Sequence, residues 1–183
     1  MSTLRVPVGP SDHAQGEADA AVTLVEYGDY ECPYCGEAYP VVKAIQQRFG
    51  NDLRFIFRNF PIAQLHPHAL VAAMTAEFAG AHGQFWAVHD ALFEQQASLG
   101  LPLFEQVVAD RGLSPERLRD AIDKVEFADR IRDDFNGGVR SGVNGTPSFF
   151  INGRRYDGPP EERAMGDALE TAMAEVRGLH SRT

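Results

Sequence analysis

The feature that most constrains the fold is an apolar strand that leads directly into a helix and is followed by a second strand. Ala21–Tyr27 is short, β-branched and almost continuously apolar, which is typical of a strand buried on both faces. Gly28–Glu31 interrupts this run, and apolar residues recur at helical spacing from Pro33 to Phe49. Leu53–Phe57 then alternates as a strand does. A strand–helix–strand unit of this length predicts parallel pairing with a right-handed crossover.

The middle of the chain is expected to be helical, from about Pro61 to Asn144. Within it, Ser114-Pro115 offers an N-cap residue followed by proline at the first helical position. Asn136-Gly137-Gly138 is expected to loosen the chain after the last apolar stripe.

A strand, a tight turn and a returning strand follow. Ser148–Ile151 and Arg154–Tyr156 are the strands, and Asn152-Gly153 is the two-residue hairpin turn between them. Pro159-Pro-Glu-Glu162 is expected to start a final helix. The order is therefore β-α-β, a block of helices, then β-β-α, which predicts an α/β fold around a mixed central sheet.

Composition narrows the class of partner. The chain has 183 residues, of which 44% are hydrophobic and 23% charged, as expected for one globular domain. A net charge of −9 argues against nucleic acid and anionic membrane surfaces as partners. The first residues lack the pattern of a secretory leader, so we expect a cytoplasmic location, or an extracytoplasmic one if a leader has been removed.

Cysteine is confined to one local pair. The chain contains two cysteines, Cys32 and Cys35, so a structural disulfide framework is not expected. A zinc site would usually need a second ligand pair; His66 and His68 are candidates, but two residues apart on a loop they indicate zinc only weakly. An incidental buried pair is the other alternative to redox chemistry, and we expect no metal and no cofactor beyond the cysteines.

The position of the pair favours redox chemistry. Cys32 falls where the strand gives way to the helix, near unpaired backbone N–H groups that stabilise an anion. Such sites lower the pKa of a cysteine, and the thiolate is its reactive form. Cys32, at the exposed end, is expected to attack or be attacked, and Cys35, one turn into the helix, to resolve the mixed disulfide.

Two other features can support this chemistry. Glu26 lies inside the apolar strand, where a buried carboxyl would have a raised pKa and could relay a proton, although it could also point to solvent. Thr146-Pro147 precedes the strand that begins at Ser148. Proline there is ordinary in its trans form, whereas a cis-proline would offer backbone groups to a bound peptide.

Four motifs together resemble the DsbA-like thioredoxin-fold proteins, over about residues 20–176. They are Val22-Thr-Leu-Val-Glu-Tyr-Gly-Asp-Tyr-Glu-Cys-Pro-Tyr-Cys35, Phe57-Arg-Asn-Phe-Pro61 with His66-Pro-His-Ala69, Gly83-Gln-Phe-Trp-Ala-Val-His-Asp-Ala-Leu-Phe93, and Val143-Asn-Gly-Thr-Pro-Ser-Phe-Phe-Ile-Asn-Gly153. The resemblance implies a thioredoxin-like fold with an inserted helical domain. It places the thioredoxin-fold parts at about residues 20–60 and 145–178, and the insertion at about 61–144, in a single domain of residues 1–183.

The resemblance also implies roles for individual residues. Cys32 would be the nucleophile, Cys35 the resolving thiol and Glu26 a buried catalytic carboxyl. The expected substrate-binding residues are Pro33, Tyr34, Thr146 and Pro147. The Pro-Tyr dipeptide between the cysteines, also familiar from glutaredoxins, leaves the reduction potential open.

The leading hypothesis is a thiol–disulfide oxidoreductase that acts on cysteine-containing proteins or small thiols and is recycled by a further redox partner. A glutathione-linked transferase or isomerase on the same fold is a second hypothesis. A non-catalytic peptide-binding or holdase module is the third. The sequence does not determine the direction of electron flow, the substrate or the oligomeric state.

Overall fold

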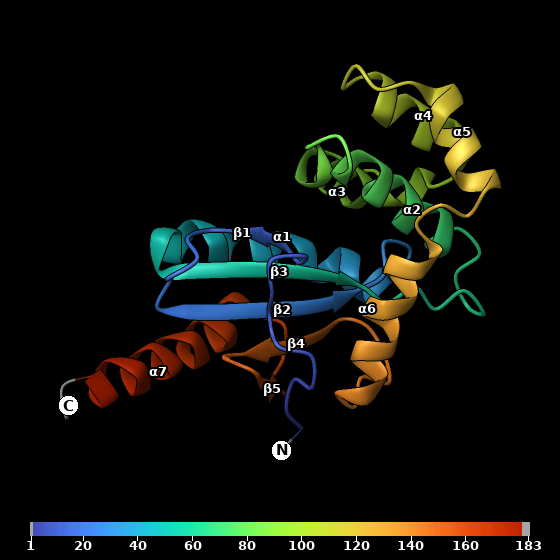
Figure 1. Ribbon diagram of the computed structural model, residues 1–183. Coiled ribbons are helices and arrows are strands. Elements are labelled where there is room, and N and C mark those ends of the chain that lie inside the picture. Colours follow the sequence, from blue (N-terminus) through green and yellow to red (C-terminus); the bar gives the residue numbers. More distant parts are fainter. Residues whose placement is uncertain (1, 181–183) are drawn as a thin grey trace.

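The computed structural model describes residues 2–180 and places five strands in one mixed sheet (Figure 1). The strands are β1 (His13–Gln15), β2 (Val22–Gly28), β3 (Leu53–Asn59), β4 (Ser148–Ile151) and β5 (Arg154–Tyr156). Their order is β1-β3-β2-β4-β5, in which only β2 and β3 pair in parallel. The expected parallel unit and the thioredoxin-like α/β fold are both confirmed.

Seven α-helices surround the sheet in the described part of the chain. They are α1 (Pro33–Phe49), α2 (Ala69–Gly80), α3 (Phe85–Glu94), α4 (Leu101–Ala109), α5 (Pro115–Asp123), α6 (Ala128–Arg140) and α7 (Glu162–His180), with short 3-10 turns η1 (Gly50–Asp52) and η2 (Gln96–Ser98). We call residues 69–140, which hold α2 to α6, the helical block. Figure 1 shows α2 to α5 gathered beside the end of the sheet where β2 and β3 terminate. Across residues 2–180, no helix has the length and apolar character needed to span a membrane.

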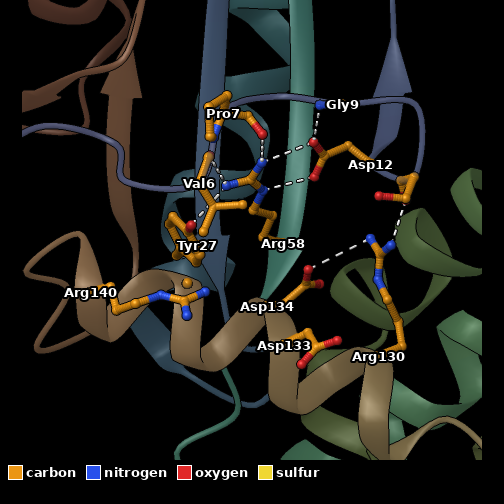
Figure 2. A pocket seen from close by; sticks show the side chains of 12 residues that line it. Val6, Pro7, Gly9, Asp12, Tyr27, Arg58, Arg130, Asp133, Asp134 and Arg140 are labelled. Carbon is orange, nitrogen blue, oxygen red and sulfur yellow. Dashed lines mark hydrogen bonds and ion pairs between the residues drawn. The ribbon is translucent and has the colours of Figure 1, made fainter.

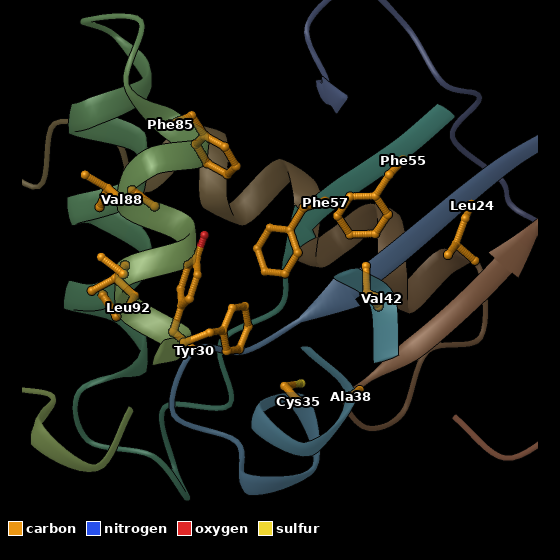
Figure 3. Close-up of a cluster of buried hydrophobic side chains, with 14 of the residues drawn as sticks. Leu24, Tyr30, Cys35, Ala38, Val42, Phe55, Phe57, Phe85, Val88 and Leu92 are labelled. Atoms are coloured by element: carbon orange, nitrogen blue, oxygen red, sulfur yellow. The ribbon is translucent and has the colours of Figure 1, made fainter. Parts of the chain in front are cut away.

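The two faces of the sheet bury different sets of side chains. One face carries Leu24 and Phe57 and packs under α1, α7 and the helical block. Figure 3 shows Tyr30 on this side, between Phe57 of β3 and the α3 residues Val88 and Leu92. The residues of the other face are Val25, Tyr27, Ile56 and Phe150, which pack with Phe60, Val143 and the partly buried Phe135 of α6. Because side chains alternate along β2, Glu26 lies on the first face, with Leu24.

Two expectations about local structure need correction. No strand is expected from the sequence before Ala21, whereas His13–Gln15 forms β1 and pairs with Phe55–Phe57. The expected loosening at Asn136–Gly138 is also wrong, because α6 continues to Arg140. A side chain at Gly138 would place its Cβ 2.7 Å from the Phe60 ring and 3.0 Å from the Tyr27 ring. This glycine therefore lets the helix approach the sheet closely.

Gly138→Ala is expected to lower the free energy of unfolding by about 1–3 kcal/mol, because the added methyl overpacks the contact with Phe60 and Tyr27. Gly178→Ala is the matched control: at this helical glycine no atom of residues 2–180 lies within 4 Å of an added Cβ, so alanine should leave stability unchanged or raise it by up to about 1 kcal/mol. Urea-induced unfolding of the two variants measures the difference. Equal effects would contradict a close approach at Gly138.

Candidate active site

The two cysteines lie at the start of α1, just beyond the end of the central strand β2. Cys32 is the N-cap residue of α1 and Pro33 its first residue, as the spacing predicts. Both thiols are free, and Cys32 exposes 4% of its surface whereas Cys35 exposes none. The expectation that Cys32 lies at an exposed end therefore needs refinement, since its sulfur is mostly covered.

Part of that cover comes from the loop before β4. The peptide bond between Thr146 and Pro147 is cis, and the Cys32 S–H donates a hydrogen bond of 3.3 Å to the carbonyl of Thr146. The Thr146 hydroxyl is buried and has no hydrogen-bond partner among residues 2–180 in this dithiol form, and it lies near enough to Cys32 to lower the pKa of that thiol. The fold thus brings Thr146 and Pro147 to the cysteine pair from a distant part of the sequence.

The two thiols have opposite electrostatic environments. The hydrogen bond from the Cys35 thiol, assisted by the Thr146 hydroxyl and the backbone N–H groups of Cys35 and Tyr34, lowers the pKa of Cys32 to about 5 against the opposing effect of burial. Burial, the hydrogen bond to Cys32 and the charge of Glu26 raise the pKa of Cys35 well above its ordinary value. At neutral pH this geometry favours a thiolate at position 32 and a thiol at position 35.

Glu26 is buried on the face of β2 that α1 covers. It exposes 3% of its surface and is flanked in the sheet by Phe57 of β3 and Phe149 of β4. Burial, reinforced by the nearby charge of Cys32, raises the pKa of this carboxyl from 4.5 to about 8. The solvent-facing alternative for Glu26 is therefore wrong.

The remaining expected site residues differ in their surroundings. Pro33 and Tyr34 are exposed, and Tyr34 presents 68% of its surface to solvent. His66 and His68 do not act as a pair: His66 Nδ1 lies 2.7 Å from the Asp29 carboxylate, and His68 Nδ1 lies 2.8 Å from that of Glu31.

Asp29 is a site residue that the sequence analysis missed. Its buried carboxylate accepts hydrogen bonds from the backbone N–H groups of Glu31 at 2.9 Å and Ile62 at 2.8 Å, besides its contact with His66. Its backbone carbonyl accepts from the N–H of Cys32, and its own N–H points to the Cys35 sulfur at 3.5 Å. An aspartate in the break before Cys32 is a turn-forming signal that could have indicated this role.

Gln96 of η2 is a second residue that the sequence did not reveal. Its side-chain amide donates to the carbonyls of Tyr30 and Cys32. Nothing in the spacing of residues in the helical block marks this glutamine, because its partners are backbone groups more than sixty residues away.

A separate polar cavity of about 510 Å³ lies near the opposite face of the sheet (Figure 2). Its buried Arg58 is fully occupied by contacts within the chain, since its guanidinium bonds to both carboxylate oxygens of Asp12, the Tyr27 hydroxyl and the carbonyls of Val6 and Pro7. This network anchors the N-terminal segment to β3 and does not reach Glu26.

Comparisons with known proteins agree with this geometry. The pattern of the family described as Thioredoxin matches residues 9–171. BdbD from Bacillus subtilis superposes with a TM-score of 0.85 over 94% of this chain and 98% of its own, at 24% identity. The alpha-DsbA1 protein from Wolbachia pipientis superposes with a TM-score of 0.81 over 94% of this chain and 96% of its own, at 21% identity. The chain belongs to the thioredoxin family, and its fold is that of the DsbA-like proteins.

Other similar proteins carry different names. A thioredoxin-like oxidoreductase from Silicibacter pomeroyi is 28% identical, with a TM-score of 0.78 over 90% of this chain and 93% of its own. The Na(+)/H(+) antiporter NhaA 1 of Salinispora arenicola is 43% identical over 176 residues, which are 95% of this chain. This chain spans only 27% of the length of that relative, so the antiport activity in its name belongs to the longer protein.

Glu26→Gln is expected to change how stability depends on pH. The folded chain holds the Glu26 proton to about pH 8, whereas the unfolded chain releases it near 4.5, so the wild type loses stability as pH rises between these values. Because glutamine carries no charge, the variant does not lose stability in this way as pH rises. The stability of the variant relative to the wild type should therefore rise from about pH 5 to about pH 8.

Urea unfolding of both proteins at the two pH values measures this difference. Repeating it with Cys32 and Cys35 replaced by serine removes the cysteine charges as a cause. A pH dependence that is the same with glutamate and glutamine would show that the Glu26 carboxyl is not held in its protonated form.

Proposed function

We propose that this DsbA-like chain is a thiol–disulfide oxidoreductase that exchanges disulfides through Cys32 and Cys35. The observation that carries the proposal is the placement of the Cys32 sulfur at the N-terminus of α1, against the Thr146 carbonyl and with Cys35 directly behind it. The reactive sulfur is stabilised as a thiolate, and the resolving sulfur is fully buried. The oxidoreductase name of the relative from Silicibacter pomeroyi supports the same class.

The exchange moves two electrons in two substitutions at sulfur. In the oxidising direction, a substrate thiolate attacks Cys32 Sγ of the Cys32–Cys35 disulfide, and Cys35 leaves and takes up a proton. A second substrate thiolate then attacks the substrate sulfur of the mixed disulfide and releases Cys32 as a thiolate. The substrate dithiol is oxidised, the cysteine pair is reduced, and the reverse sequence reduces a substrate disulfide.

Glu26 serves the proton transfers of Cys35 in this proposal. Its carboxyl lies close enough for its charge to raise the pKa of Cys35, and its own pKa of about 8 lies near neutrality. A carboxyl of this kind can give a proton to Cys35 as it leaves and accept one when Cys35 attacks.

The substrate is a cysteine-containing protein or a small thiol. Exposed Tyr34 and Pro33 flank Cys32 on one side and the Thr146-Pro147 loop covers the other, so we assign these four residues to substrate contact. A separate redox partner recycles the pair, and no cofactor beyond the cysteines is required. The comparisons do not support the cytoplasmic location expected from the sequence. Because the redox state of the compartment affects the direction of exchange, this direction is to be tested in both oxidising and reducing buffers.

Cys32→Ser is expected to abolish both insulin reduction and oxidation of a reduced peptide, because the attacking sulfur is lost. Cys35→Ser should instead accumulate mixed disulfides on Cys32, visible by mass spectrometry, because the resolving thiol is absent. Full dithiol exchange by Cys32→Ser is incompatible with the proposal, and saturable glutathione turnover by that variant would favour a glutathione-linked enzyme instead.

Glu26→Gln should slow Cys35-dependent release at neutral pH by about 100-fold, a typical contribution of acid–base catalysis.

The reaction of Cys32 with iodoacetamide should already be near its maximal rate at pH 7, because the pKa of about 5 leaves this thiol ionised. The rate should fall as the pH drops through about 5. Cys32→Ser provides the background rate, since buried Cys35 should react only slowly. A rate that still rises steeply between about pH 7 and pH 9 would mean that position 32 is an ordinary thiol.

A further inference from the structure

Gln96 connects the helical block, through hydrogen bonds, to the turn that carries the reactive cysteine. Its Nε2 group donates hydrogen bonds of 2.8 Å to the Tyr30 carbonyl and 2.9 Å to the Cys32 carbonyl. It is the first residue of η2, between α3 and α4, whereas Tyr30 and Cys32 lie between β2 and α1. One side chain therefore fixes two backbone carbonyls at the start of the active-site helix.

Gly36 provides the space for this side chain. A Cβ at Gly36 would lie 2.2 Å from Gln96 Oε1, 2.9 Å from its Cδ and 3.0 Å from its Nε2. These are the three atoms nearest to such a Cβ, and all belong to Gln96. The glycine at position 36 therefore leaves the room that the Gln96 amide occupies beside the first turn of α1, which indicates a specific contact.

The contact affects the electrostatics of the Cys32 sulfur. A carbonyl oxygen carries partial negative charge, which disfavours a neighbouring thiolate, and two donated hydrogen bonds offset that charge. They also hold the turn, so that the backbone N–H groups of Tyr34 and Cys35 stay directed at the sulfur. The ionisable groups that act on this centre are Glu26 from β2, Cys35 from α1 and His66 from the loop before α2, and none of them is altered by a change at Gln96.

We propose that Gln96 is a positioning residue for the exchange reaction: by binding the carbonyls of Tyr30 and Cys32, it keeps the Cys32 sulfur at the N-terminus of α1. The inference rests on the proposed function, because it concerns the reactivity of the same sulfur. It assigns the helical block a part in setting the redox equilibrium of the cysteine pair.

Gln96→Ala is expected to raise the pKa of Cys32 by about half a unit to one unit, the worth of a typical hydrogen bond. The equilibrium with glutathione should shift about three- to tenfold toward the Cys32–Cys35 disulfide, because the thiolate is less stabilised. Gln96→Glu should raise the pKa further, since a carboxylate cannot donate a hydrogen bond and repels the thiolate. Thiolate ultraviolet absorbance against pH, and oxidised fractions in glutathione buffers, measure the two quantities.

Gly36→Ala provides an independent test of the same contact. In the wild type, its methyl should displace the Gln96 amide and raise the pKa of Cys32 as Gln96→Ala does. In the Gln96→Ala protein it should add little to that change, and it should stabilise α1, because alanine is the better helix former. Gln95→Ala, at an exposed neighbouring position, is the matched control and should change neither quantity.

The outcomes separate this inference from the proposed function. A wild type that exchanges disulfides and has a low Cys32 pKa, combined with a Gln96→Ala protein that keeps both the pKa and the glutathione equilibrium, would overturn the role of Gln96 alone. Additive effects of Gly36→Ala and Gln96→Ala on the pKa would also overturn it. An unreactive Cys32 in the wild type would instead refute the proposed function itself. A lower melting temperature of Gln96→Ala with unchanged pKa and equilibrium shows a structural role only and likewise contradicts the proposal.

Discussion

The candidate active site depends on the partial positive charge at the N-terminus of α1. The backbone N–H groups of Tyr34 and Cys35 lie there, just beyond the central strand β2, and they donate to the sulfur of the N-cap residue Cys32. No side-chain cap competes for these donors, and Pro33 contributes none. A negative charge on the Cys32 sulfur is therefore stabilised by the hydrogen bond from Cys35 and by these backbone groups. The buried carboxyl of Glu26 keeps its proton instead, because burial and the nearby charge of Cys32 raise its pKa to about 8.

The fold was predictable where one physical signal dominated. The apolar run of β2 and the alternation of β3 gave the correct strands, and Asn152-Gly153 takes positive φ at both residues, as its turn type requires. Ser114 accepts a hydrogen bond from the N–H of Arg117, as an N-cap should. β1 escaped detection because an edge strand of three residues carries too little periodicity to be recognised. Gly137 and Gly138 were misread because sequence alone does not show the sheet that α6 approaches.

The residues of the candidate site also fall into two groups, those that the sequence alone indicates and those that it does not. Cys32 and Cys35 could be found from their spacing at a strand–helix junction, and Glu26 from its charge within an apolar strand. The isomer of the Thr146-Pro147 bond is fixed by its tertiary setting and had no local signal. The roles of Asp29 and Gln96 were not predictable because each acts on backbone groups, which look alike in every sequence. Their partners become known only when loops distant in sequence lie together.

The helical block, which is distant in sequence from the cysteines, also holds the turn that precedes Cys32. Tyr30, in the turn before Cys32, packs against Phe57 of β3 and Phe93 of α3, and its hydroxyl lies 3.0 Å from Nδ1 of buried His89. Burial lowers the pKa of His89 to about 3, so this ring stays neutral and the contact does not change across the physiological pH range. The turn is therefore held from the sheet by aromatic packing, from α3 by an uncharged hydrogen bond and from η2 by the amide of Gln96. A sulfur that must stay within hydrogen-bond distance of fixed donors needs a rigid backbone beneath it, and here residues far along the chain supply part of that rigidity, beside the local contacts of Asp29.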